Sequence, residues 1–319
     1  MAVDFATKEK PYELFDKAKR RGTWDPAAID LSADVEHWEH GFSDAQREAI
    51  MGTFVGFYEG EESVTRTLVP YLTLVDRLED APFSTIQMEM FLTTHLFEEA
   101  KHTDFFSMYF EEVFDTQETE IDTHESSNYW QNPELKEFLV DDLESVGDRM
   151  REVARGGDQR EMRYVLAEGV MHYMGIVEAQ LAKTGYEIFN GVFDEISESM
   201  ETEVLPGCQE GLKLIRQDEG RHIANGRWMM RKLAEEDPDI VPTVYEPKIE
   251  EYIERLTGRR ESQERYDRSY TFDIQELTRT VANDNLQQTI AVVGEEYFER
   301  FDADVDIAAA NRELSASDD

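Results

Sequence analysis

Two pairs of residues in this sequence have the types and the spacing to bind metal ions. Glu99 is followed three residues later by His102, and Glu219 is followed three residues later by His222. Residues three apart lie on one face of a helix, so the carboxylate and the imidazole of each Glu-x-x-His step can reach the same ion or neighbouring ions. Two such steps therefore suggest a site for two metals.

The helix face that each step occupies supports this interpretation. Apolar residues recur at three- and four-residue steps around both pairs, which is the pattern of one side of a helix. Because the candidate ligands lie within these stripes, we expect their side chains to point into the core. The first stripe consists of Met88, Leu92, His95, Glu99, His102, Phe106, Tyr109 and Val113, and the second of Leu212, Ile215, Glu219, His222, Gly226 and Met229.

Two further glutamates lie inside apolar helical stripes. Glu61 falls within a long helix that a Ser43 and Gln46 cap is expected to open, and Glu178 shares its face with Gly175. One Glu from each of two helices, with Glu-x-x-His from two others, is the pattern of four-helix di-metal carboxylate bundles. The alternative is that these acids are surface residues on helices of a different phase. The four helices are expected over about 43–75, 83–114, 159–189 and 207–234.

The chemistry of this set of side chains favours particular metals. Buried ionised carboxylates need positive charge, since each unpaired one costs on the order of several kcal/mol. An oxygen-rich set with one imidazole for each metal suits Fe or Mn and is a poor match to tetrahedral structural Zn. Asp218, beside Glu219, is expected to accept a hydrogen bond from a ligand imidazole.

Composition limits the possible partners and the compartment. The formal net charge of −39 argues against a nucleic-acid partner, because phosphates would be repelled. The acidic side chains also repel one another, and molar salt would screen this repulsion, so we infer a halophilic host. The alternative is an acidic mesophilic protein. No apolar run is long enough to span a membrane, and the first residues contain no signal segment. With Cys208 as the single cysteine, we expect a soluble cytoplasmic protein without an internal disulfide.

The sequence predicts an all-α protein of 319 residues, large enough for a full core, with no convincing strand. We expect an N-terminal arm over residues 1–42, a helical domain over 43–302 and a flexible tail over 303–319. Gly191 and Pro206 are expected to bound a short helix, and residues 238–247 to form a linker.

The central helices, from about residue 43 to residue 230, resemble a known family. The resemblance is to the ferritin-like small subunit of ribonucleotide reductase, and more closely to its relatives, the small-subunit-like ligand-binding oxidases with a Mn/Fe cofactor. Two positions favour the oxidases: Phe106 stands where a radical-bearing small subunit usually has Tyr, and Glu61 where it usually has Asp. The matching motifs are GEESVT (60–65), FEEAKH (97–102), HY (172–173), VE (177–178), KTGY (183–186) and DEGRHI (218–223).

The resemblance implies a ferritin-like four-helix bundle with additional helices and a site that activates O2 and oxidises C–H bonds. It also implies an ether cross-link between Val64 and Tyr173, and a long-chain fatty-acid-like ligand near the metals. A homodimer is expected by the same analogy. The resemblance assigns Mn to Glu61, Glu99 and His102, and Fe to Glu178, Glu219 and His222, with Glu99 and Glu219 as possible bridges and two Fe as the alternative.

Three classes of function stay open at this point: a ligand-binding oxidase, a radical-generating small subunit of ribonucleoside-diphosphate reductase that serves a large subunit, and a metal or lipid carrier. The final residues, 311–319, contain no Tyr of the kind with which a small subunit usually docks on its large partner. The other histidines, His37, His40, His95, His124 and His172, are expected to be non-ligands, and His95 is the one that lies on the stripe facing the site.

Overall fold

The computed structural model describes residues 7–115, 137–257 and 286–289. These residues form helices, turns and irregular connecting segments, with no strand among them. The all-α prediction is therefore confirmed. The elements are α1 (Lys10–Arg21), η1 (Pro26–Ala28), α2 (Ser32–His40), α3 (Asp44–Arg77), α4 (Thr85–Glu112), η4 (Glu137–Asp141), α6 (Asp142–Gly156), α7 (Gln159–Val170), η5 (Met171–Ala182), α8 (Lys183–Met200), α9 (Pro206–Glu236), η6 (Val241–Tyr245) and α10 (Glu246–Thr257).

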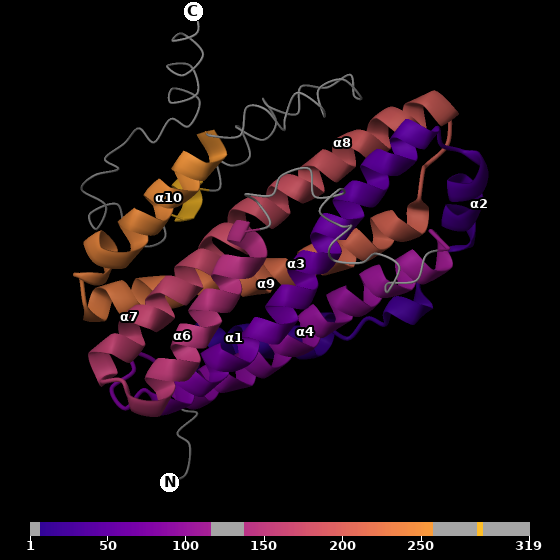
Figure 1. Ribbon diagram of the computed structural model, residues 1–319. Helices are drawn as coiled ribbons and strands as arrows, with labels where there is room; N and C mark the ends of the chain where they lie inside the picture. The colour runs from indigo at the N-terminus through magenta and orange to yellow at the C-terminus, as the bar shows by residue number, and fades with distance from the viewer. Residues whose placement is uncertain (1–6, 116–136, 258–285, 290–319) are drawn as a thin grey trace, which may run out of the picture.

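Four long helical stretches run lengthwise through the molecule: α3, α4, α9 and the continuous stretch of α7, η5 and α8 (Figure 1). Helix α3 begins at the predicted capping box, in which Ser43 Oγ accepts from the Gln46 amide and the Gln46 side chain accepts from the Ser43 amide. Helix α3 contacts α4, α4 contacts α9, and α9 contacts η5. These contacts bring the four stripes together.

Two apolar clusters fill the interior of this bundle. On α3, Tyr58 belongs to one cluster and Val64 to the other, so Glu61 lies where the two meet. Glu99 on α4, Glu178 on η5 and Glu219 on α9 fall at the same boundary between the clusters. The sequence therefore places a polar layer at one level of an otherwise apolar core.

The stretch from Gln159 to Met200 differs from the prediction in two ways. It continues through Gly191 without a break, because the residues around Gly191 pack into the apolar cluster that contains Tyr58. This packing outweighs the weak helix propensity of glycine. Its central segment, η5, is a π-helix of 12 residues between two α-helices. A π-helix joins residue i to residue i+5 and is commonly found at functional sites.

Helix α9 begins with Pro206 after Leu205, whose φ of 46° is unusual for a residue other than glycine. The buried carboxylate of Asp34, from α2, accepts from the amides of Gly207 and Cys208 at 2.8 and 2.7 Å. It also accepts from the hydroxyl of Tyr109 at 2.8 Å, which ties α2, α4 and α9 together. This cap holds the start of the helix that carries Glu219 and His222.

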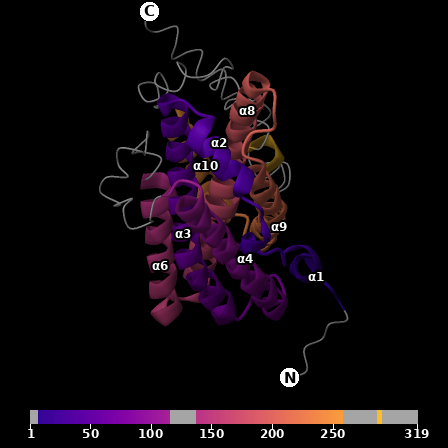
Figure 2. The ribbon, with the colours of Figure 1, turned by 90° about the vertical axis from the view of Figure 1, so that its right-hand side faces the viewer.

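Shorter helices cover the bundle. Helix α6 packs on α3, and α1 packs on α4 and α9 (Figure 2). The linker expected over 238–247 is instead helical, as η6 and the start of α10, because Val241, Val244 and Tyr245 are buried against the core. The predicted division at residues 42 and 43 stays a prediction, although α1 and α2 both contact the bundle. The predicted tail, 303–319, lies outside the described residues.

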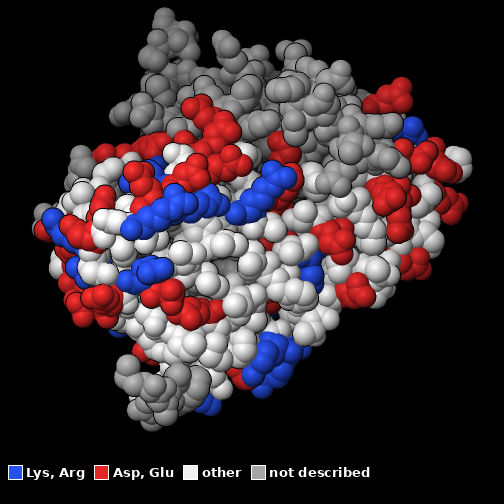
Figure 3. Space-filling view, turned by 60° about the horizontal axis from the view of Figure 1, so that its bottom comes forward, with Lys and Arg blue, Asp and Glu red and all other residues white. Residues whose placement is uncertain are grey.

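The surface is strongly acidic. Asp and Glu side chains are spread over the face drawn in Figure 3, with a smaller number of Lys and Arg side chains among them. In the described part of the chain, no helix is both long and apolar enough to cross a membrane.

Candidate metal centre

The six predicted ligands come together inside the bundle. They come from α3 (Glu61), α4 (Glu99, His102), η5 (Glu178) and α9 (Glu219, His222), and each is 7% exposed or less. Their ligand atoms form two groups in which every atom lies within 4.8 Å of the others. The alternative of surface acids on helices of a different phase does not describe this chain.

The first group consists of Glu61, Glu99, His102 and Glu219. His102 Nδ1 lies 3.3 Å from Glu61 Oε2, 3.4 Å from Glu99 Oε2 and 3.5 Å from Glu219 Oε1. One imidazole thus faces three carboxylates. Three oxygens and one nitrogen directed at a common point are a donor set that hard divalent ions accept.

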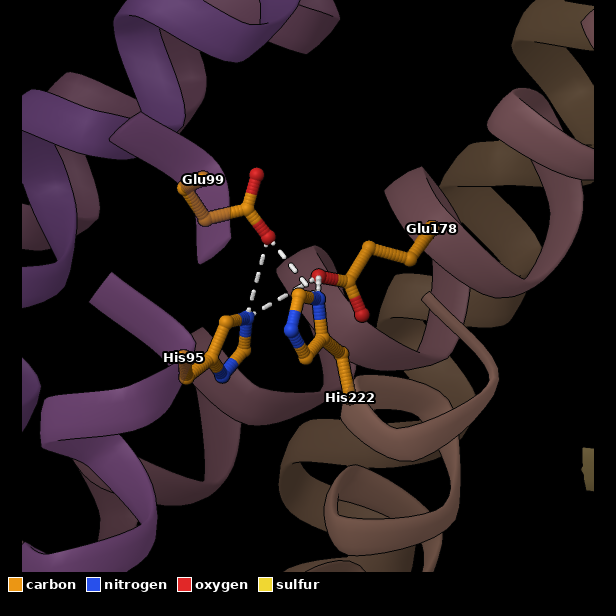
Figure 4. Close-up of side chains that lie close together, drawn as sticks. All are labelled: His95, Glu99, Glu178 and His222. Carbon is orange, nitrogen blue, oxygen red and sulfur yellow. Dashed lines mark hydrogen bonds and ion pairs between the residues drawn. The ribbon is translucent and has the colours of Figure 1, made fainter. Parts of the chain in front are cut away.

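The second group consists of His95, Glu99, Glu178 and His222, and Figure 4 shows the four side chains converging. His222 Nδ1 lies 2.9 Å from Glu99 Oε1 and 3.4 Å from Glu178 Oε1. Glu219 Oε2 lies 3.6 Å from the same nitrogen. Glu99 and Glu219 therefore each direct one oxygen to His102 and the other to His222, which is the arrangement that bridging carboxylates require.

The π-helix explains why Glu178 and Tyr173 both reach this group. In an α-helix, residues five apart are rotated by about 140° and cannot share a face. The wider turn of η5 brings such residues toward one side. Tyr173 Oη and Glu178 Oε1 accordingly lie 3.0 and 3.2 Å from the same atom, His95 Nε2.

The outer nitrogens of the two imidazoles are held crosswise. His102 of α4 faces Asp218 of α9, with Nε2 3.3 Å from Oδ2, and His222 of α9 faces Glu98 of α4, with Nε2 2.9 Å from Oε2. Arg221 donates to both acids. Such partners fix the orientation of a ligand imidazole, so that its Nδ1 points at the metal position.

Asp218 has two further donors. Trp24 Nε1 donates to its Oδ2 at 2.8 Å, and Lys101 Nζ donates to the same oxygen at 2.9 Å. Burial opposes ionisation of Asp218, but His102 and Lys101 lower the pKa of this carboxyl well below its usual value. The residue is therefore an anion that holds His102 in place.

Charges inside the centre are strongly coupled. Burial raises the pKa of Glu61 well above its usual value, and the neighbouring Glu99 and Glu219 add to this effect. Burial opposes protonation of His102 and His222, but the surrounding carboxylates raise the pKa of both imidazoles. Protons on these rings balance the carboxylates in the metal-free protein, and metal ions would replace them.

The donor set fits two metal ions. Four buried atoms of the predicted ligands have no hydrogen-bond partner among the described residues: His102 Nδ1, His222 Nδ1, Glu178 Oε2 and Glu219 Oε2. Buried polar atoms are rarely left so, and each needs an explanation. Cations between the imidazole nitrogens and the carboxylate oxygens would supply the missing partners.

The two residues predicted to form a cross-link are also buried near the centre. Tyr173 is 1% exposed and donates to Glu99 Oε1 at 2.8 Å, and Val64 is 5% exposed, in the same apolar cluster as Tyr173. Burial raises the pKa of Tyr173, and the charges of Glu178 and Glu99 raise it further. The phenol is therefore protonated at neutral pH.

Phe106 lies in a compact aromatic group beside the centre. Its ring stacks on Phe57 at 5.8 Å, and Phe57 stacks in turn on Tyr186 and Phe189 at 4.9 and 5.4 Å. The aromatic side chains that could line a ligand tunnel thus pack against one another. Phe106 has no hydroxyl, so it cannot form a tyrosyl radical at that position.

Two residues of the site were not assigned from sequence. Glu98 holds His222, and a signal existed, since an acid precedes the glutamate in both steps, as Glu98-Glu99 and Asp218-Glu219. His95 was expected to be a non-ligand, yet its Nε2 lies in the second group. Its place on the stripe facing the site was the signal.

Comparison with known proteins agrees with this geometry. A valine-to-leucine mutant of an R2-like ligand-binding oxidase with anaerobically reconstituted Mn/Fe cofactor matches with a TM-score of 0.72 and 23% identity, over 91% of this chain and 94% of that chain. An R2-like ligand-binding oxidase with aerobically reconstituted Mn/Fe cofactor matches with a TM-score of 0.71 and 24% identity, over 91% and 94%. These similarities confirm the predicted ferritin-like fold.

The family is shown by a separate comparison of sequence. The model of the family described as "Ribonucleotide reductase, small chain" matches residues 6–283, which include every residue of both groups. The resemblance predicted from the motifs is therefore confirmed at the level of the family. The chain belongs to the ribonucleotide reductase small-chain family.

Proposed function

We propose that this protein is an O2-activating oxidase with a dinuclear Mn/Fe centre, which oxidises C–H bonds and joins Val64 to Tyr173 by an ether bond. One observation carries the proposal: Glu99 and Glu219 each direct one oxygen at His102 and the other at His222. Two ions sharing two carboxylates in this way can act together on one O2. We assign Mn to Glu61, Glu99 and His102, and Fe to Glu178, Glu219 and His222, with two Fe as the alternative.

When bound, reduced metal ions would supply O2 binding and two of the four electrons that convert O2 to two waters. The protein supplies the other two. A C–H bond of Val64 and the O–H bond of Tyr173 break, a C–O bond forms, and two hydrogens leave with two electrons. Solvent provides the remaining two protons.

The side chains around Tyr173 prepare it for this reaction. Its hydroxyl donates to Glu99 Oε1, so the phenolic proton has an acceptor when the ether forms. Tyr173 and Val64 are both buried, and the surrounding apolar cluster keeps water away from the reacting bond. The similar oxidases include valine and tyrosine mutants, which accords with a role for these residue types there.

We further propose that a long-chain fatty-acid-like molecule binds with its carboxylate at the metals and its chain among the apolar side chains near the centre. Oxidation of both ions to the trivalent state would bring more positive charge than the four glutamates neutralise, and this excess would favour an anionic head group. A homodimer and a cytoplasmic location stay predictions.

The test is peptide mass spectrometry of protein reconstituted aerobically with Fe(II) and Mn(II) in high salt. We expect peptides containing Val64 and Tyr173 to be joined, with the mass of two hydrogens missing. The link should be lost in Tyr173→Phe. It should persist in Tyr71→Phe, because Tyr71 packs against the Tyr173 ring, with centroids 6.1 Å apart, and is not one of the two residues to be joined. Binding of the metals without formation of a cross-link between Val64 and Tyr173 would contradict the proposed oxidase function.

A second candidate is the radical-generating small subunit of ribonucleoside-diphosphate reductase, which the family match favours. It predicts a stable tyrosyl radical after aerobic reconstitution and a complex with a large subunit. Electron paramagnetic resonance of the same sample separates the two functions. Phe106, at the position where a radical-bearing subunit usually has Tyr, argues for the oxidase.

A further inference from the structure

His95 is a buried histidine that the predicted ligand set leaves without a role. It is 0% exposed and lies one helical turn before Glu99 on α4. Its Nε2 lies 3.2 Å from Glu99 Oε1 and 3.2 Å from Glu178 Oε1. These are the two oxygens that His222 Nδ1 also faces.

The spacing of these four atoms is the spacing of ligands around one ion. Two atoms that are each about 2.1 Å from a metal are about 3.0 Å apart at a right angle and about 3.4 Å apart at the tetrahedral angle. The contacts of Glu99 Oε1 and Glu178 Oε1 with the two imidazole nitrogens measure 2.9, 3.2, 3.2 and 3.4 Å. All four fall close to this range.

The orientation of the His95 ring agrees with the distances. It stacks on the His222 ring with centroids 3.6 Å apart and an angle of 21° between the planes. Two nearly parallel imidazoles thus direct one nitrogen each at the same pair of carboxylate oxygens (Figure 4). A hydrogen bond to Tyr173 Oη, at 3.0 Å, is the competing role for His95 Nε2.

We propose that His95 is a protein ligand of the second metal position, together with Glu99, Glu178 and His222; this inference rests on the proposed function. The second position then has two imidazole ligands, whereas the first has one. Imidazole suits Fe(II) well, while sites of carboxylate and water suit Mn(II), and Fe(II) binds nitrogen ligands more tightly than Mn(II) does. His95 thereby makes the second position selective for Fe.

The test measures metal binding without O2. Competition titration would give the affinity of the wild type, His95→Gln and Tyr71→Phe for Fe(II) and for Mn(II). We expect His95→Gln to lower Fe(II) affinity at least about tenfold and to reduce the preference for Fe over Mn. Tyr71→Phe is the control, because Tyr71 packs against the Tyr173 ring and belongs to neither group of metal-binding residues, so Fe(II) affinity should stay unchanged. Circular dichroism of each metal-free variant checks that it folds.

Anomalous diffraction from crystals of the wild type loaded with Fe(II) and Mn(II) gives an answer that needs no variant. We expect Fe at the second position with His95 Nε2 about 2.1 Å away. The inference is overturned if two ions occupy the centre while His95 Nε2 stays bonded to Tyr173, or if His95→Gln binds Fe(II) as the wild type does; the proposed function survives both results. If the wild type binds no ions at these residues, the proposed function fails as well.

Discussion

At the scale of single residues, the centre is organised by acids that do not face the metal positions. Asp218 belongs to α9 but is hydrogen-bonded to the imidazole of His102 on α4. Glu98 belongs to α4 but is hydrogen-bonded to the imidazole of His222 on α9. Arg221 lies between them and donates to both. The two imidazoles are therefore oriented by one connected network. Substitution of either acid should therefore change metal binding at the position whose imidazole it holds, although that imidazole comes from the other helix.

We predict that Asp218→Asn weakens metal binding at the position that includes His102, and that Glu98→Gln weakens it at the position that includes His222. Each loss should be about 10- to 100-fold, as is usual when the partner of a ligand imidazole is removed. Titration of the metal-free variants with Mn(II) and Fe(II) would measure it. Glu62→Gln is the matched control, because Glu62 pairs with Arg66 at the surface. Equal affinities for all three variants would refute the crossed arrangement.

At the scale of elements, the close approach of α9 to η5 sets the distance between His222 and Glu178. Gly226 of α9 faces Met174 of η5, and a Cβ atom on Gly226 would overlap the Cβ of Met174. Since Met174 Cβ is fixed to the backbone, the two helices would have to separate. The glycine is thus required by the packing.

We predict that Gly226→Ala destabilises the protein by about 1–3 kcal/mol, the usual cost of overpacking a core. Urea unfolding in high salt would measure the change. Gly220→Ala, on the same helix, is the control: apart from its own helix backbone and chain neighbours, no atom of the described residues lies within 4 Å of the added Cβ, so higher helix propensity should leave stability equal or greater by up to about 1 kcal/mol. If both substitutions changed the free energy of unfolding equally, the change would come from helix propensity and not from overlap with Met174.

The sequence predicted most of the helices and the faces that they turn inward. It did not predict the features that depend on packing between helices or on the winding of a helix. The stripes around Glu61, Glu99 and Glu219 predicted inward carboxylates, because a regular helix repeats its faces. The π-helix could not be foreseen, since its wider turn depends on the neighbours that hold Tyr173 and Glu178 in the interior. Glu98 lies beside the stripe, and its burial depends on how α9 crosses α4. His95 lies on the stripe, but its position alone does not separate a ligand from a core residue.

At the scale of the whole molecule, the excess of acidic groups opposes the compact state. The chain contains 71 Asp and Glu against 32 Lys and Arg. Many acids lie over the surface, and their repulsion is strong at low ionic strength, where the Debye length is about 10 Å at 0.1 M salt. At 1 M it falls to about 3 Å, and the repulsion is screened. The halophilic origin stays a prediction.

We predict that the melting temperature of the metal-free protein rises by roughly 10 °C or more between 0.1 M and 3 M KCl, because screening of several kcal/mol is worth about 2–4 °C for each kcal/mol. Calorimetry at several salt concentrations would show it. The double variant Glu201→Gln and Glu203→Gln removes two exposed charges next to α8 and should flatten the dependence. A melting temperature independent of KCl would exclude charge repulsion as the limit on stability.

The number of residues between Tyr173 and Glu178 is tied to the winding of η5. If η5 were wound as an α-helix with its length unchanged, these two residues, five apart, would be rotated by about 140° from each other. Removal of one residue between them would leave them four apart, and in an α-helix residues four apart are rotated by only about 40°. A π-helix with a spacing of five and an α-helix with a spacing of four therefore both place this pair on one face. During divergence of this chain, a change of one residue in this spacing should accordingly be accompanied by a change of winding, so that the contact between the two side chains persists while their distance in the sequence does not.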